Sequence, residues 1–427
     1  MEKMKDSGIR LIGVIPSDWN LKKIKYVCFE NSNSLPENTS PDFEFDYIDI
    51  GSVKFGKGIT DYQRMQFSKA PSRARRIVKK GDVIISTVRT YLKSVASIDE
   101  VKTPIIVSTG FSVLTPKENI DKNYLKFAVM CDSFTSEVEA FSTGITYPAI
   151  NSSSLINLKI PLPPIDIQKR IADFLDSKCA KIDSLKNDIE KQIETLEQYK
   201  KSVITETVTK GINPNVKMKD SGIEWIGEIP EHWETKRAKY IFTPRNDRGN
   251  KIELQLLSPT QKYGVIPQAL YDEISGMNSV KLKENTDLNL LKTCHKGDYC
   301  ISLRSFQGGF EYSKYEGVVS PAYQIFYPTI KISDGYYKYL FKEKNFIEKI
   351  NSFTLSLRDG KPISYFDFSN MYLPLPSAEE QKEIADYLDS KCTAIDNIIN
   401  SKKQQLEKLE EYKKSLIFEY VTGKREV

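Results

Sequence analysis

Apolar positions over residues 165–209 repeat with the period of an α-helix. Prolines at 161, 163 and 164 precede this segment, and the next glycine or proline is at 211. The apolar residues recur at steps of three and four, which predicts a stripe along one helix of about 65 Å. The segment after residue 376 has the same pattern. The stripe positions that we expect to pair the two helices or to dock a partner are Ile182, Leu185, Ile189, Leu196, Tyr199, Val203, Ile395, Leu409, Tyr412 and Leu416.

The two helical segments belong to a duplication that covers the chain. Residues 4–27 and 218–241 are identical at 14 of 24 positions, at an offset of 214. Residues 160–209 and 373–422 are identical at 28 of 50 positions, at an offset of 213. The segments between these blocks, 28–159 and 242–372, have nearly equal lengths but share little sequence. We therefore expect a pseudo-twofold repeat whose framework is copied and whose globular parts have diverged.

Both globular parts have a mixed pattern. Runs at 82–88, 105–108 and 111–114 predict strands, and residues 123–141 predict a helix. In the second half, 299–303 and 323–327 predict strands and 336–350 a helix. The predicted fold class is α+β, with globular domains at 1–160 and 211–373 joined by long helices at 161–210 and 374–427. We expect the helices to form an antiparallel coiled coil, which could also be only a spacer.

Composition narrows the class of protein only slightly. The net charge of +5 permits a polyanionic partner without requiring one. No apolar run is long enough to span a membrane, and the N-terminus lacks a signal region, so we expect a cytoplasmic protein with no membrane partner. Six scattered cysteines and two histidines form no metal-binding motif. We therefore expect no metal site, and reduced, mostly buried thiols.

Basic residues concentrate between residues 64 and 93. This segment contains nine Lys or Arg residues and a single acid, Asp82. Clustered cations neutralise phosphates, and Arg and Lys side chains also read base edges. Such a cluster alone favours an ordinary solvated loop, but in a duplicated and diverged module a DNA-binding surface is the better interpretation. Its candidates, with two on a later loop, are Arg64, Lys69, Arg73, Arg75, Arg76, Lys80, Arg89, Tyr91, Lys93, Thr143 and Tyr147.

The second globular part is less basic. Its cations are accompanied by acids, and its most polar loops, at 304–309 and 358–361, fit plain turns equally well. The corresponding DNA-binding candidates are Lys292, Lys296, Arg304, Ser305, Gln307, Arg358 and Lys361. Neither half has a GxxxxGK[ST] or GxGxxG nucleotide-binding motif. Ser320–Tyr323 is only weakly similar to the tetrapeptide of adenine methyltransferases, because the second proline is missing. No catalytic residue is predicted.

The repeated motifs together resemble the specificity subunits of type I restriction-modification systems. Each half opens on Ser-Gly-Ile, Ile-Gly, Ile-Pro and Trp, at 7–19 and 221–233. Lys-Gly-Asp follows at 80–82 and 296–298, and Pro-Leu-Pro at 161–163 and 374–376. Gln168 and Gln381 then precede an Ile-Ala pair in each long helix. The resemblance extends over essentially the whole chain, and the order of the motifs is specific.

This resemblance implies a non-catalytic subunit with two target recognition domains. Each domain would read one half of a split, asymmetric site in double-stranded DNA. The long helices would fix the gap between the half-sites and dock two modification subunits, and restriction subunits would join that complex. S-adenosylmethionine, ATP and Mg²⁺ would be bound by those partners, and the assembled complex would be an adenine-N6 methyltransferase and an ATP-dependent endonuclease that defends against foreign DNA.

Two alternatives stay open at this point. One is a self-sufficient restriction or methyltransferase enzyme with two recognition domains, which would need a cofactor or metal site that the sequence does not reveal. The other is a coiled-coil adaptor that binds only proteins. The bases that are read, the spacer length and the stoichiometry are not encoded in any recognisable motif.

Overall fold

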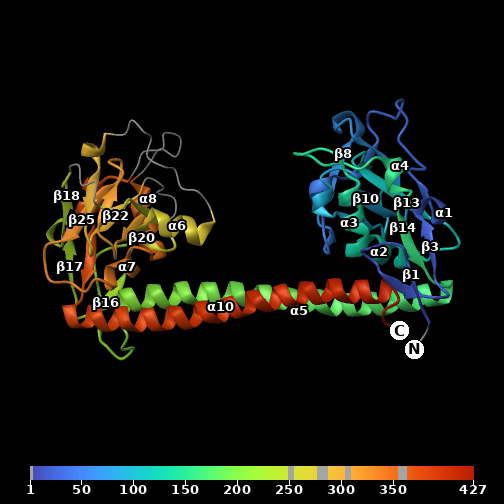
Figure 1. Ribbon diagram of the computed structural model, residues 1–427. Helices are drawn as coiled ribbons and strands as arrows, with labels where there is room; N and C mark the ends of the chain where they lie inside the picture. The colour runs from blue at the N-terminus through green and yellow to red at the C-terminus, as the bar shows by residue number, and fades with distance from the viewer. Residues whose placement is uncertain (1–2, 249–253, 277–286, 303–308, 354–362) are drawn as a thin grey trace. The chain divides into compact units, whose positions relative to one another are not determined.

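The computed structural model describes residues 3–248, 254–276, 287–302, 309–353 and 363–427 (Figure 1). The chain divides into two compact units: unit 1 is Met1–Glu190 with Lys403–Val427, and unit 2 is Lys191–Lys402. Each unit contains a mixed α and β domain and one segment from each of two long helices, α5 (Ile165–Lys210) and α10 (Ala378–Val421). The two helices lie where the apolar period predicts them, and Gly211 follows α5 with a left-handed φ of 78°.

Unit 1 is built on two four-stranded sheets, in the orders β11-β10-β13-β4 and β8-β5-β12-β9. The strands predicted at 82–88, 105–108 and 111–114 are β10, β12 and β13. The bounds are β1 (Met4–Asp6), β2 (Val14–Pro16), β3 (Asn20–Lys23), β4 (Cys28–Glu30), β5 (Glu44–Ile48), β6 (Val53–Lys54), β7 (Gly58–Ile59), β8 (Gln63–Gln66), β9 (Ala74–Val78), β10 (Val83–Ser86), β11 (Val95–Ser97), β12 (Ile105–Ser108), β13 (Phe111–Pro116) and β14 (Lys159–Leu162).

The helix predicted at 123–141 is two helices, α2 (Lys122–Met130) and α3 (Asp132–Ala140). The break falls at Cys131, whose ψ of 135° is far from helical. Apolar periodicity continues through the break, which is why the sequence pattern shows one helix. The remaining helical turns are α1 (Ile24–Val27), α4 (Ser152–Leu155), η1 (Ile50–Ser52), η2 (Phe67–Lys69) and η3 (Thr90–Leu92).

Unit 2 has a four-stranded sheet in the order β18-β25-β22-β23, and its core contains a cluster of aromatic rings around Phe242 and Phe326. The helix predicted at 336–350 is again two helices, because Glu343 caps the second by accepting the Phe346 amide at 2.7 Å. The bounds are β15 (Met218–Asp220), β16 (Glu228–Pro230), β17 (Glu234–Arg237), η4 (Ala238–Tyr240), β18 (Phe242–Arg245), β19 (Leu257–Thr260), β20 (Gly264–Pro267), α6 (Gln268–Ser275), η5 (Leu288–Leu290), β21 (Lys292–Cys294), β22 (Tyr299–Ile301), β23 (Phe310–Tyr312), β24 (Gly317–Val319), β25 (Gln324–Pro328), α7 (Tyr336–Leu340), α8 (Lys344–Ser352), α9 (Tyr365–Asn370) and β26 (Tyr372–Leu375).

Within each unit the two helix segments run antiparallel. In unit 1, Lys186 pairs with Glu410, and Lys413 contacts Asp183 at 2.8 Å. In unit 2, Lys200 contacts Asp396 at 2.6 Å. The Lys413–Asp183 and Lys200–Asp396 pairs exchange under the repeat offset of 213, so the duplication extends to the contacts between the helices.

The framework of each domain is fixed to α5 or α10 by equivalent contacts. The β3–β14 and β17–β26 pairs are both antiparallel, and each leads into its long helix. The buried Gln168 accepts the Asp121 amide and donates to the Pro163 carbonyl, both at 2.8 Å. Gln381 makes the same two contacts with Ser333 and Pro376, both at 2.9 Å. Gln168 and Pro163 are identical to Gln381 and Pro376, so these identities between the halves join each domain to its helix.

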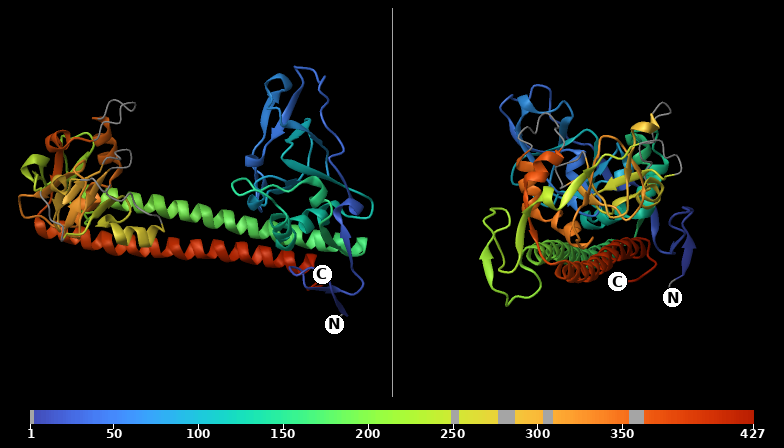
Figure 2. Two further views of the ribbon diagram at one scale, coloured as in Figure 1. Left: turned by 45° about the horizontal axis from the view of Figure 1, so that its top comes forward. Right: turned by 90° about the vertical axis from the view of Figure 1, so that its left-hand side faces the viewer.

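Unit 1 is assembled from both ends of the chain, which lie side by side in Figure 1 and in both views of Figure 2. Its core includes Leu416 and Val421 of α10, and the Lys424 ammonium donates to the Ile12 carbonyl at 2.7 Å. A Cβ added at Gly423 would lie 2.4 Å from the Pro16 ring and 3.0 Å from that of Trp19. The close approach and a φ of 68° explain a glycine at this position.

Candidate nucleic-acid interface

Two loops of unit 1 that the sequence separates by more than 50 residues form one surface. Val88 and Ala149 form an antiparallel bridge, and the Ile150 amide donates to the Thr87 carbonyl at 2.9 Å. The Thr90 and Ser142 hydroxyls are 2.8 Å apart. The loop after β10 and the loop after α3 are thereby joined, which brings together five of the predicted DNA-binding residues: Arg89, Tyr91, Lys93, Thr143 and Tyr147.

Two basic residues of this surface, Arg89 and Lys93, have a strained backbone conformation. Arg89 and Lys93 flank η3 with left-handed φ values of 51° and 48°, which L-residues rarely adopt. Such strain persists only where surrounding contacts impose it, and it is frequent at functional sites. The exposed Arg89 guanidinium lies 5.1 Å from the ring centre of Tyr147, itself 63% exposed. Lys93 is less available, because its ammonium lies 3.4 Å from the Asp132 carboxylate.

The remaining cations of the 64–93 segment do not form one uniform patch. Lys69, Arg73 and Lys80 are exposed. Arg73 is linked to the Arg89 loop through the turn at 108–110, because the Thr109 amide donates to the Arg73 carbonyl and the Thr87 amide to the Gly110 carbonyl. Arg64, in contrast, pairs with Glu44 at 3.0 Å and Asp46 at 3.4 Å on its own sheet, which compensates its charge.

Arg75 and Arg76 are half-buried, and their side chains contact other residues of unit 1. The Arg75 guanidinium stacks 4.9 Å from the centre of the Phe67 ring. The Nε atom of Arg76 is buried with no hydrogen-bond partner among the described residues, and burial lowers the pKa of this guanidinium. Adjacent strand residues point to opposite faces, so a run of cations along β9 cannot all meet one ligand.

In unit 2 the structure corrects one prediction. Lys292 is only 8% exposed, and its ammonium donates to the Tyr323 carbonyl at 2.5 Å. Burial, followed by the nearby Arg248 charge, lowers the pKa of Lys292. It therefore does not present a cation to phosphate, because strand β21 points it inward. Lys296 is exposed. Five further candidates lie outside the described residues: Arg304, Ser305, Gln307, Arg358 and Lys361.

The duplicated Lys-Gly-Asp motif is a capped turn. The glycines at 81 and 297 have left-handed φ values of 93° and 95°. Asp82 accepts the Lys79 amide at 2.9 Å and the Thr115 hydroxyl at 2.7 Å, and burial raises its pKa. The Asp82 side chain is therefore structural, whereas the lysines of the motif, Lys80 and Lys296, are exposed.

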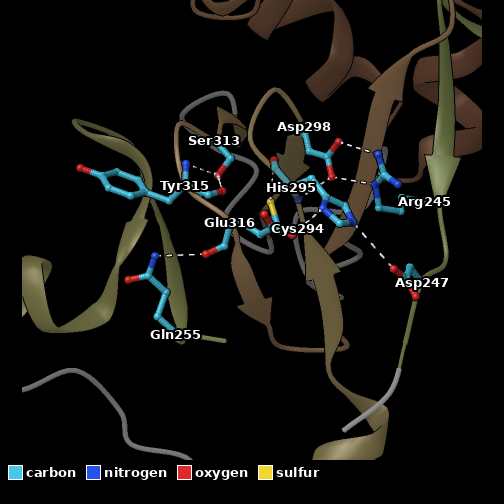
Figure 3. Close-up of polar contacts among 9 residues, drawn as sticks. All are labelled: Arg245, Asp247, Gln255, Cys294, His295, Asp298, Ser313, Tyr315 and Glu316. Atoms are coloured by element: carbon cyan, nitrogen blue, oxygen red, sulfur yellow. Dashed lines mark hydrogen bonds and ion pairs between the residues drawn. The ribbon is translucent and has the colours of Figure 1, made fainter. Parts of the chain in front are cut away.

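A polar cluster surrounds the second Lys-Gly-Asp turn and was missed by sequence reasoning (Figure 3). Asp298 accepts the His295 amide at 2.8 Å and forms two hydrogen bonds with Arg245, at 2.8 and 3.0 Å. The His295 ring lies 3.0 Å from Glu316 and 3.7 Å from Asp247. The side chains come from separate strands and loops, so no sequence spacing reveals them. They satisfy one another and anchor this end of the sheet.

The described residues show no other kind of site. All six cysteines are buried and unpaired, which confirms the expected buried thiols. Within the described part of the chain, no group of three or more His, Cys, Asp or Glu side chains is placed to hold a metal ion. Among the helices that the structure describes, none has the length and apolar character needed to cross a bilayer.

Comparison with known proteins identifies the family. The family model for the type I restriction modification DNA specificity domain matches twice, at residues 16–195 and 230–411. The chain belongs to this family. It is 26% identical over 424 residues to the putative type I restriction enzyme MjaX specificity subunit of Methanocaldococcus jannaschii, covering 97% of this chain and 95% of the relative. It is 28% identical over 335 residues to the MjaVIII specificity subunit of the same organism, covering 76% and 75%.

Solved structures share the fold of this type I specificity subunit. A chain from a structure on complex assembly and conformational transition of the type I R-M system gives a TM-score of 0.73 at 20% identity, covering 96% of this chain and 99% of that one. The HsdS subunit from Thermoanaerobacter tengcongensis gives 0.53 at 19% identity, covering 96% and 98%. The two family matches confirm that the repeat consists of two DNA specificity domains.

Burial divides the predicted stripe of this specificity subunit into two groups. Ile182, Val203, Ile395 and Leu416 are buried, and Ile189, Leu196 and Leu409 are half-buried, so these positions pack within the units. Leu185, Tyr199 and Tyr412, together with Ile398, are about half exposed, at 52%, 53%, 52% and 47%. The same period of three and four therefore includes a packed seam and an uncovered apolar flank.

Proposed function

We propose that this chain is the non-catalytic DNA-recognition subunit of a type I restriction-modification complex. Each unit reads one half of a split, asymmetric site in double-stranded DNA. Modification subunits supply S-adenosylmethionine and methylate adenine at N6, and restriction subunits supply ATP- and Mg²⁺-dependent cleavage. The observation that carries the proposal is the duplicated framework with diverged loops. Unit 1 carries an exposed cation and aromatic surface at Arg89 and Tyr147, whereas Lys292 of unit 2 is buried.

Mapping methylated adenines across a genome tests this proposal. Cells that contain the modification subunit are compared with and without this chain. We expect methylation at one bipartite motif only when the chain is present. Methylation by the purified chain alone, with S-adenosylmethionine and Mg²⁺, would instead favour the self-sufficient enzyme. Assembly with partner proteins but no salt-sensitive DNA binding would favour the adaptor.

The long helices act in this proposal as the spacer between half-sites. A helix of 46 residues is about 69 Å long, since each residue adds about 1.5 Å. Inserting four residues after Gln192 in α5 and four after Lys402 in α10 keeps the pair matched and adds about 6 Å. At about 3.4 Å per base pair, the spacer of the mapped motif should lengthen by one or two base pairs. An unchanged spacer would contradict the spacer role.

Two equivalent apolar patches support docking of two copies of one partner. Leu185 and Tyr412 lie at one level of the helix pair in unit 1, beside the Lys186–Glu410 contact. Tyr199 and Ile398 are their repeat equivalents in unit 2, beside the Lys200–Asp396 contact. Exposed aromatic and aliphatic side chains that survive duplication at the same positions are typical of anchors in protein interfaces.

A charge placed in either patch should displace one modification subunit. We expect Leu185→Asp and Ile398→Asp each to weaken one of the two docking events at least tenfold, and the double variant to weaken both, because a buried unpaired carboxylate is costly at an interface. Native mass spectrometry of the mixed subunits counts the copies. Ser184→Asp adds the same charge about 100° around the helix and should leave two copies bound. Equal loss with the control would contradict the patch assignment.

A further inference from the structure

The loop at 142–149 of unit 1 presents an aliphatic side chain to solvent. Ile145 is fully exposed, at 103% of its reference area. The loop that carries it is closed, because Thr143 and Ala149 exchange both backbone hydrogen bonds at 2.9 Å. Gly144 enters the tip with a φ of 104°, where a Cβ would lie 3.1 Å from the Tyr147 carbonyl oxygen. The tip is therefore a built turn rather than an irregular tail.

The two joined loops that carry Ile145 also expose three aromatic rings and one arginine. Phe141, Tyr91 and Tyr147 are 59%, 53% and 63% exposed on the two joined loops. Arg89 lies over the Tyr147 ring. Single exposed apolar residues are common on proteins, but a group of this size beside a strained arginine marks a binding surface. The exposed Arg89 guanidinium favours an anionic occupant and the exposed rings favour one that also offers apolar groups; a DNA duplex offers both.

The width of the loop fits the major groove of DNA and exceeds that of the minor groove. Two paired backbone segments lie about 4.8 Å apart before their side chains are counted. The major groove is about 12 Å wide and the minor groove about 6 Å. Only the major groove admits such a loop without deforming the duplex. Among the four base pairs, the only apolar group exposed on that edge is the C5-methyl of thymine.

We infer that Ile145 contacts the C5-methyl group of a thymine in the half-site read by unit 1. This inference rests on the proposed DNA recognition and adds to it a specificity-determining residue and the base that it reads. Burying one methyl group is worth about fourfold in affinity. Arg89 and Tyr147 hold the loop tip in the groove, and Ile145 adds discrimination at one position.

Replacing each thymine of the mapped half-site with deoxyuridine, one at a time, removes only that methyl. With the assembled complex, one replacement should weaken wild-type binding about fourfold. Ile145→Ala should weaken binding to the thymine site by a similar factor, and the deoxyuridine replacement should then cause no further loss. Val101→Ala, a truncation of another exposed aliphatic residue of unit 1, should preserve both the affinity and the thymine preference.

The outcomes separate this inference from the proposed function. If the wild-type complex shows no site-specific binding, the proposed function fails. If it binds specifically but the two changes are additive, or if no thymine of either strand responds to deoxyuridine, the Ile145 contact is wrong. Loss of modification-subunit docking in Ile145→Ala, measured by native mass spectrometry, would instead assign the loop to a protein interface.

Discussion

The Arg89→Ala variant should bind its DNA site about 5- to 150-fold more weakly than the wild-type complex, because a well-placed arginine contact in DNA is worth about 1–3 kcal/mol. The Arg89 guanidinium is exposed, is supported by the Tyr147 ring and lies on a backbone that only local contacts hold in the left-handed region. Affinity measured by fluorescence anisotropy at fixed salt gives the size of the effect.

Arg64 offers a matched control for this prediction. Its charge is compensated by Glu44 and Asp46, so Arg64→Ala should change the affinity less than about twofold. Arg89→Gly tests the backbone separately: it relieves the left-handed strain and should not lower the melting temperature, while binding is still lost. If Arg64→Ala and Arg89→Ala weaken binding equally, the effect is a general loss of charge and the assignment of Arg89 is wrong.

The second prediction with a large effect concerns the stability of unit 1 when Gln168 is replaced. Gln168 is 1% exposed, and its amide joins the Asp121 amide to the Pro163 carbonyl. Gln168→Leu removes the side-chain partner of the part-buried Asp121 amide and of the buried Pro163 carbonyl, at a cost of about 1–3 kcal/mol each. The free energy of unfolding of unit 1 should therefore fall by about 2–6 kcal/mol. Urea denaturation followed by hydrogen exchange assigns the loss to a unit.

The repeat supplies its own comparison. Gln381→Leu removes the equivalent contacts with Ser333 and Pro376 and should lower the exchange protection of unit 2 instead. Gln198, an exposed residue of α5, serves as the surface control, and Gln198→Leu should change stability by less than about 0.5 kcal/mol. Equal destabilisation of both units by Gln168→Leu alone would contradict the local role.

The framework was predictable because it depends on periodicity and on duplication, both of which are visible along the chain. The helices α5 and α10 and the strand β10 lie where the pattern predicts them. The break at Cys131 was not predictable, since the apolar period continues through it. A pattern of apolar residues indicates the spacing of side chains. It does not indicate that the ψ angle of one residue, Cys131, departs from the helical value.

The candidate site was predictable only in part, because a count of cations ignores what each one touches. Arg64 has carboxylate partners and Lys292 is turned inward. Neither fact has a signal in composition. Arg89 and Tyr147 were predicted on separate loops, and the pairing that joins them depends on the fold. Ile145 was missed because the candidates were chosen by charge and polarity, and an apolar loop residue has neither.

Because unit 1 consists of two separate segments of the chain, the two units are completed in a fixed order during synthesis. During synthesis, unit 2 is complete once Lys402 has emerged, whereas the core of unit 1 requires Leu416 and Val421. The domain that is made first is therefore finished last. Until then, the apolar surface that these residues cover is open to solvent and to unwanted association. A nascent chain stalled before residue 416 would consequently hold one finished domain and one unfinished domain, and the unfinished one would be the first synthesised.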